Sequence, residues 1–154
     1  MTWDEVINNP ILQDLPFKIE LNKYGQILMS PASNKHGIIQ FDVGRKIDRS
    51  KGKGTIITEC SIETADGVKV ADVAWASDEF IEEYGEATPY PKAPEICVEV
   101  VSPSNSKGEI EHKVSLYLAK GALEVWVVNQ KREIAIFTHT GQIKKSNLIP
   151  KIKL

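Results

Sequence analysis

The segment EICVEVVSPSN, residues 95–105, constrains the fold of this chain more than any other stretch. Its first half is an apolar run that is typical of a buried strand, yet it carries Glu99 in its middle. An ionised carboxylate is costly to bury alone, so Glu99 needs either a partner or a raised pKa. The fold must therefore bring a neutralising group to this strand.

The sequence after this strand predicts a helical crossover to another strand. The polar loop SPSNSKG leads into residues 109–120, where Ile110, Val114 and Leu118 recur every four residues and predict one apolar helix face. Residues 123–129, LEVWVVN, then predict a strand.

Hairpins and further helices are predicted elsewhere, and together with the crossover they indicate an α/β (α+β mixed) fold, with one mixed β-sheet flanked by helices. The tight turn NKYG joins two strands, and Ile39, Val43 and Ile47 mark the apolar stripe of a long helix. Helices are predicted over residues 2–9, 34–49 and 77–85, and strands over 17–21, 26–30, 55–60, 68–76 and 133–139, before an extended tail.

Length and composition predict one compact domain over residues 1–154. No apolar run approaches the roughly 18 residues that span a bilayer, so we expect no membrane association. The N-terminus lacks the pattern of a signal peptide. Cys60 and Cys97 lie far apart in strand-like segments, which indicates two reduced, packed thiols and a cytoplasmic protein, with a metal or redox role as the alternative.

Charge argues against a dedicated nucleic-acid-binding domain, because the net charge is −2 and such domains are usually basic. The charge is uneven, however. Residues 45–53 carry five basic side chains against Asp48, and residues 144–153 carry four lysines and no acid. These runs indicate either a local basic face or an ordinary solvated helix end and tail.

Two acids break apolar patterns in different strands: Asp72 lies within VADVAW, and Glu99 lies within ICVEVV. Two carboxylates that face one point on neighbouring strands repel each other, and a divalent cation converts that repulsion into binding. Hard oxygen ligands favour Mg²⁺ or Mn²⁺ over Zn²⁺, and a water held by the metal can become the nucleophile. The alternative for either acid is a hydrogen bond to the backbone or a pair with a surface lysine.

A lysine two residues after Glu99 would share its face of the strand, but that position is Val101. Lys113 is the expected replacement, because it lies about one turn into the following helix and its flexible stem can reach back to Glu99. The alternative is a solvated helix lysine.

Two other lysines and a tyrosine belong to the same region. Lys107 in the loop is the nearest rival of Lys113, and Lys120 lies about three turns into the helix and is a poorer candidate. Tyr117 follows Lys113 by four residues and is expected to hold or orient it.

The series MSPAS-NKHG, VADVAW, PEICVEVVSPSN and K-x-x-x-Y-x-x-x-G-A-x-E-V-W-V-V resembles the Uma-type "putative restriction endonuclease" family. This family is a bacterial branch of the PD-(D/E)XK nuclease superfamily. The resemblance runs from about residue 17 to 140, and its most specific part is the VEVVSPS strand and loop with the helix and strand that follow. It implies a restriction-endonuclease-like core of a mixed sheet flanked by helices.

The resemblance also implies roles for individual residues. Asp72 and Glu99 match the motif acids and would be metal ligands, with the backbone carbonyl of Val100 as a third. Lys113 matches the lysine that this branch carries on the helix. It would activate the attacking water or stabilise charge on the phosphate.

Further polar positions of the family match Glu20 and His36, and both would line the site; a capping or packing role is the alternative for His36. Ala71 stands where the PD motif has its proline, which changes backbone stiffness but not chemistry.

The sequence therefore predicts a Mg²⁺- or Mn²⁺-dependent endonuclease that hydrolyses DNA phosphodiester bonds with Asp72, Glu99 and Lys113. Because cutting both strands of a duplex usually takes two active sites, a homodimer is expected. The alternative functions are a catalytically inactive nuclease-fold module that binds nucleic acid or a protein partner, and a purely structural pair of Glu99 with Lys113.

Overall fold

The computed structural model describes residues 1–154 and contains a six-stranded mixed sheet. Its strands follow one another across the sheet in chain order, and only β5 and β6 run parallel. These two strands are the ones joined by the helical crossover that the sequence predicts. The strands are β3 (Thr55–Thr64), β4 (Gly67–Ala76), β5 (Ile96–Val100), β6 (Glu124–Val128), β7 (Ile134–Thr138) and β8 (Gly141–Ile143).

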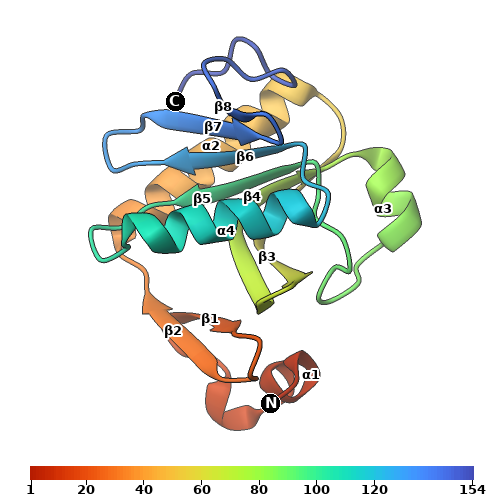
Figure 1. The fold of residues 1–154 in the computed structure, drawn as a ribbon, viewed down its shortest axis with the longest axis vertical. Coiled ribbons are helices and arrows are strands. Elements are labelled where there is room, and N and C mark those ends of the chain that lie inside the picture. The colour runs from red at the N-terminus through yellow and green to blue at the C-terminus, as the bar shows by residue number, and fades with distance from the viewer.

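Helices cover both faces of this sheet (Figure 1), with α4 in front of it and α2 behind it. The alternation of side chains along β5 divides the core between these faces: Cys97 belongs to the apolar cluster that contains Val114 of α4, whereas Val98 packs with Ile39 of α2. None of the helices combines the length and apolar character needed to span a membrane. The helices are α1 (Trp3–Ile7), α2 (Asn34–Lys51), α3 (Asp78–Tyr84) and α4 (Lys107–Ala119), with a 3₁₀ turn at Pro10–Leu12.

The N-terminal hairpin forms a separate two-stranded sheet of β1 (Phe17–Leu21) and β2 (Ile27–Pro31). In Figure 1 it lies with α1 below the main sheet, beside the ends of β3 and β4. The hairpin approaches β4 through side chains: the backbone N–H of Val70 donates to the carboxylate of Glu20 at 2.7 Å. Because a side chain takes this donor, the hairpin docks against the sheet without extending it.

The β3–β4 turn fixes the position of the hairpin. Gly67 has a φ of +76°, and a Cβ at this position would lie 2.4 Å from the carbonyl oxygens of Leu21 and Asn22. Only glycine allows so close an approach without strain. Beside it, the buried ammonium of Lys69 donates to the carbonyl of Leu21 at 3.3 Å and pairs with Asp66 at 3.4 Å.

A buried carboxyl group anchors the C-terminal segment. Glu124 accepts hydrogen bonds from the indole N–H of Trp126 at 2.8 Å and the hydroxyl of Ser146 at 2.7 Å. Its other oxygen accepts from the backbone N–H groups of Asn147 at 2.7 Å and Leu148 at 3.2 Å. The tail is therefore held against the core, where Ile149 is buried.

The structure confirms the mixed α/β class, the crossover and the order of the predicted elements. Some boundaries were wrong: the strand predicted over residues 55–60 continues to Thr64, and the helix predicted over 109–120 begins at Lys107, with Ser106 as its N-cap. The single mixed sheet is confirmed, and the hairpin adds a small second sheet because it pairs only with itself. Cys60 and Cys97 are free and buried, and burial raises the pKa of Cys60 to about 12.

Replacing Glu124 with alanine leaves several donors at the tail without their acceptor. We expect Glu124→Ala to lower the free energy of unfolding by roughly 2–4 kcal/mol. Urea denaturation measures this loss, with Glu111→Ala on the exposed face of α4 as the matched control. The control should change stability by less than about 0.5 kcal/mol. Equal effects of the two substitutions would contradict the anchoring role.

Candidate active site

The register of β4 and β5 brings the two acids of the apolar strands together. Val73 pairs with Val98 in this antiparallel arrangement, so the next position along both strands places Asp72 opposite Glu99. Both side chains are buried, with 1% of Asp72 and 3% of Glu99 exposed. The structure thus places the two predicted acids as cross-strand neighbours.

The two oxygens of Asp72 have different partners. Oδ2 accepts the backbone N–H of Val100 at 2.7 Å, which fixes the orientation of the carboxylate. Oδ1 lies 3.1 Å from the ammonium of Lys18 and 3.3 Å from Nε2 of His36. One oxygen is therefore held by the backbone of β5, and the other faces two groups that can carry positive charge.

The two carboxylate oxygens of Glu99 also have different partners. Its Oε1 accepts the hydroxyl of Tyr117 at 2.7 Å and lies 3.6 Å from the ammonium of Lys113, and both residues come from α4. Its Oε2 lies 3.3 Å from the ammonium of Lys18. Asp72 Oδ1 and Glu99 Oε2 therefore converge on a single cation, the ammonium of Lys18.

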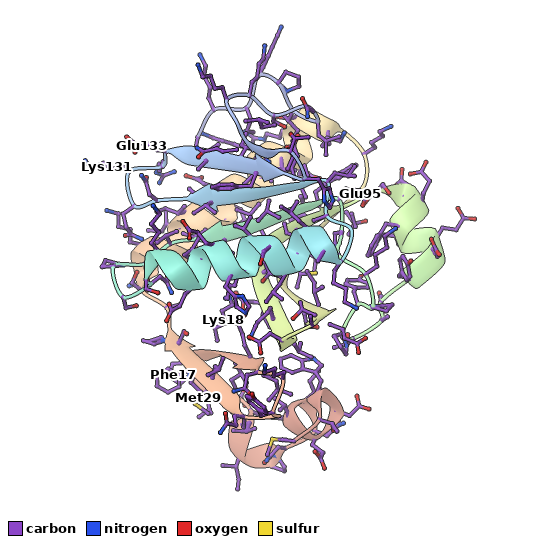
Figure 2. All side chains as sticks on the ribbon, viewed as in Figure 1. Phe17, Lys18, Met29, Glu95, Lys131 and Glu133 are labelled. Atoms are coloured by element: carbon purple, nitrogen blue, oxygen red, sulfur yellow. The ribbon has the colours of Figure 1, made fainter.

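Lys18 belongs to the site although its sequence context does not predict it. It belongs to β1, and Figure 2 shows it between the hairpin and the main sheet, beneath α4. Its side chain is only 12% exposed. The sequence does carry one signal for Lys18. Side chains alternate between the two faces of a strand, so within FKIEL Lys18 shares a face with Glu20, a candidate site residue.

Lys113 reaches the site from nearly two turns into α4, because the helix begins earlier than predicted. Its ammonium pairs with Glu20 at 2.9 Å as well as with Glu99. Glu20 is buried behind Lys113 rather than lining the cavity described below. Lys113 thus links the hairpin to β5.

The other residues considered near Lys113 behave differently. Lys107 is 89% exposed and pairs with Glu111, and Lys120 is the C-cap residue of α4. The expected hydrogen-bond partner of Tyr117 was wrong: its hydroxyl donates to Glu99 and not to Lys113. Tyr117 acts on Lys113 only through the carboxylate that they share.

Burial and charge set the pKa values of the cluster in opposite directions. Burial raises the pKa of Asp72, but the nearby charge of Lys18 and the hydrogen bond from His36 outweigh it and hold that pKa well below its usual range. For Glu99, burial dominates over the neighbouring lysines and raises the pKa. Burial lowers the pKa of Lys18, but the charges of Glu99 and Asp72 outweigh it and raise that pKa above its usual range.

A cavity of about 460 Å³ opens onto these acids. Glu59 lines it and adopts a φ of +52° within β3, a left-handed conformation that is rare for a residue with a side chain. Gln40 of α2 supports this position by donating to Glu59 at 2.8 Å and to the backbone carbonyl of Asp72 at 2.7 Å. No sequence pattern predicts a site role for Glu59 or Gln40. The lining also includes Phe17, Lys18, Ser30, Pro31, His36, Glu99, Val100, Ser102, Asn105 and Lys113.

The groups that could hold a cation here are carboxylate oxygens. No three or more histidine, cysteine, aspartate or glutamate side chains converge as a metal-binding group. Two carboxylates do converge, on the position of the Lys18 ammonium. Mg²⁺ is commonly bound by one or two carboxylates together with water, so this donor set fits a hard divalent cation.

Comparison with known proteins shows the family and the fold of the chain. The sequence model of the Uma2 family, described as "Putative restriction endonuclease", matches residues 10–149. No curated protein matches the chain in sequence. Among solved structures, the chain is similar to a "putative nuclease belonging to DUF820" from Anabaena variabilis ATCC 29413. The TM-score is 0.72 and the identity 20%, over 100% of this chain and 94% of that one. The predicted nuclease-like fold is therefore confirmed.

The contact between His36 and Asp72 predicts a specific pH dependence. The hydrogen bond between His36 and Asp72 raises the pKa of His36. The contact therefore stabilises the folded protein fully below the ordinary histidine pKa, and this stabilisation is lost as pH rises through the pKa of His36 in the folded protein. We expect the difference in free energy of unfolding between wild type and His36→Gln to be larger at about pH 6 than at about pH 8.5. Urea denaturation at both pH values measures it, and a difference independent of pH would contradict the assignment.

Proposed function

The chain belongs to the Uma2 family, and we propose that it is a metal-dependent endonuclease that hydrolyses DNA phosphodiester bonds. Family membership supports a nuclease role. The metal, the DNA substrate and the residue roles are our proposal. The observation that carries it is the convergence of Asp72 Oδ1 and Glu99 Oε2 on one cation position at the cavity floor.

In this proposal, Asp72 and Glu99 hold Mg²⁺ or Mn²⁺, with the backbone carbonyl of Val100 as a further ligand. Val100 lines the cavity, and its N–H already orients Asp72. When bound, the metal would polarise the phosphate and lower the pKa of a water molecule. Tyr117 fixes the rotamer of Glu99 through their hydrogen bond, so this carboxylate needs little reorganisation.

Lys113 provides positive charge at the rim of the same site. Lys113 lines the cavity, and its ammonium pairs with Glu20 and Glu99. A fixed ammonium in a water-poor site stabilises negative charge that develops on a reacting phosphate. His36 also lines the cavity, where it can donate to Asp72 or to a bound phosphate.

A catalytically inactive module that binds nucleic acid or a protein partner is the second candidate. One observation favours it: Lys18 already forms an ion pair with each acid, so both acids have a cationic partner without a metal. The net charge of −2 also offers no general attraction to DNA. A homodimer and a cytoplasmic location remain predictions under either function.

Cleavage of supercoiled plasmid and branched DNA with Mg²⁺ or Mn²⁺ tests the proposed activity. Asp72→Asn and Glu99→Gln keep the shape of each side chain but remove its charge. We expect each to lower the cleavage rate by at least about 100-fold, because a metal ligand is lost. Glu111→Gln, an exposed substitution on α4, should cleave like the wild type. Equal rates in the wild type and both site variants would refute the proposal.

A further inference from the structure

Lys18 occupies the place that both acids face. Its ammonium lies 3.1 Å from Asp72 Oδ1 and 3.3 Å from Glu99 Oε2, and these are the two oxygens that neither the backbone nor Tyr117 holds. Lys18 cannot keep both contacts while another cation uses the same oxygens. Lys18 and a bound metal are therefore alternatives at this position.

The charges of the cluster lead to the same conclusion. Lys18 already lies against both acids, so a divalent cation added without any movement would place its two positive charges beside the Lys18 ammonium. Like charges this close and this poorly solvated repel strongly.

The two lysines differ in how firmly they are held. Lys113 pairs with Glu20 at 2.9 Å and with Oε1 of Glu99 at 3.6 Å, so it keeps its ion pairs if a metal takes Glu99 Oε2. Lys18 has ion pairs only with Asp72 and Glu99 and loses both. Its side chain already lines the 460 Å³ cavity, where Ser30 and Asn105 are polar neighbours. A flexible lysine stem at the cavity wall can move its ammonium into that space.

We propose that Lys18 is a displaceable internal cation: it bridges Asp72 and Glu99 in the metal-free protein and moves into the cavity when a divalent metal binds. This inference rests on the proposed function, because it takes the same acids as the metal ligands. It assigns to the N-terminal hairpin a role in controlling how tightly the metal is held.

Mn²⁺ binding to the full chain tests this competition without any assay of activity. Free Mn²⁺ is followed by electron paramagnetic resonance in the wild type and in Lys18→Met, Lys113→Met and Lys107→Met. Binding is assigned to the site where Asp72→Asn abolishes it. Because the competing charge is gone, we expect Lys18→Met to bind Mn²⁺ about 10-fold more tightly than the wild type or better. Lys113→Met should have a smaller effect, and Lys107→Met, altered at an exposed lysine, none.

The outcomes separate this inference from the proposed function. If the wild type and Lys18→Met both fail to bind Mn²⁺ at the site, the proposed function and this inference fall together. If both bind with equal affinity, the function stands and the competition is refuted. If Lys18→Met binds more weakly, Lys18 helps to hold the metal and the inference is wrong.

A second readout uses the wild-type protein and does not depend on the folding of a variant. Acetylation of lysines by a small acylating reagent, followed residue by residue with mass spectrometry, reports the accessibility of each ammonium. We expect Lys18 to be protected without metal and to react several-fold faster with saturating Mn²⁺, because a displaced ammonium becomes accessible and loses its ion pairs. Lys107 should react equally in both conditions. Protection of Lys18 that persists with Mn²⁺ bound would overturn the displacement.

Discussion

Two carboxylates buried opposite each other on adjacent strands repel, and the candidate site is organised around that repulsion. The pairing of β4 with β5 ends at Val73 and Val98, one residue from Asp72 and Glu99, so the sheet holds the two acids close together. Positive charge from outside the sheet offsets this repulsion. Lys18 bridges both acids, and Lys113 lies near the other carboxylate oxygen of Glu99. Removing one partner from such a buried cluster leaves an uncompensated charge, so the acids and lysines depend on one another.

This constraint explains why the elements around the sheet are arranged as they are. The β5–α4–β6 crossover returns the chain over the strand that carries Glu99, which brings Lys113 and Tyr117 to it. The hairpin brings Lys18 and Glu20 from below the main sheet, and its docking relies on the close approach at Gly67. In Figure 1, α4 lies in front of the main sheet and the hairpin lies below it.

Much of this could be predicted from the sequence, because the signals were local. An acid within an apolar strand is conspicuous, so Asp72 and Glu99 were found, and the reach of Lys113 follows from a short loop and a helix. Lys18 could not be placed in the same way: it is 54 residues from Asp72 and 81 from Glu99, and only tertiary docking brings them together. The strained backbone of Glu59 likewise leaves no mark on a strand-like sequence.

The central claim is that Asp72 and Glu99 form one cation position, held by Lys18 until a metal takes it. Anomalous diffraction from crystals grown with Mn²⁺ measures this directly, because it locates the metal and the side chains together. The account predicts a Mn²⁺ peak bonded to Asp72 Oδ1 and Glu99 Oε2, with the ammonium of Lys18 moved into the cavity. A structure in which Lys18 still bridges both acids and Mn²⁺ does not bind there would contradict it.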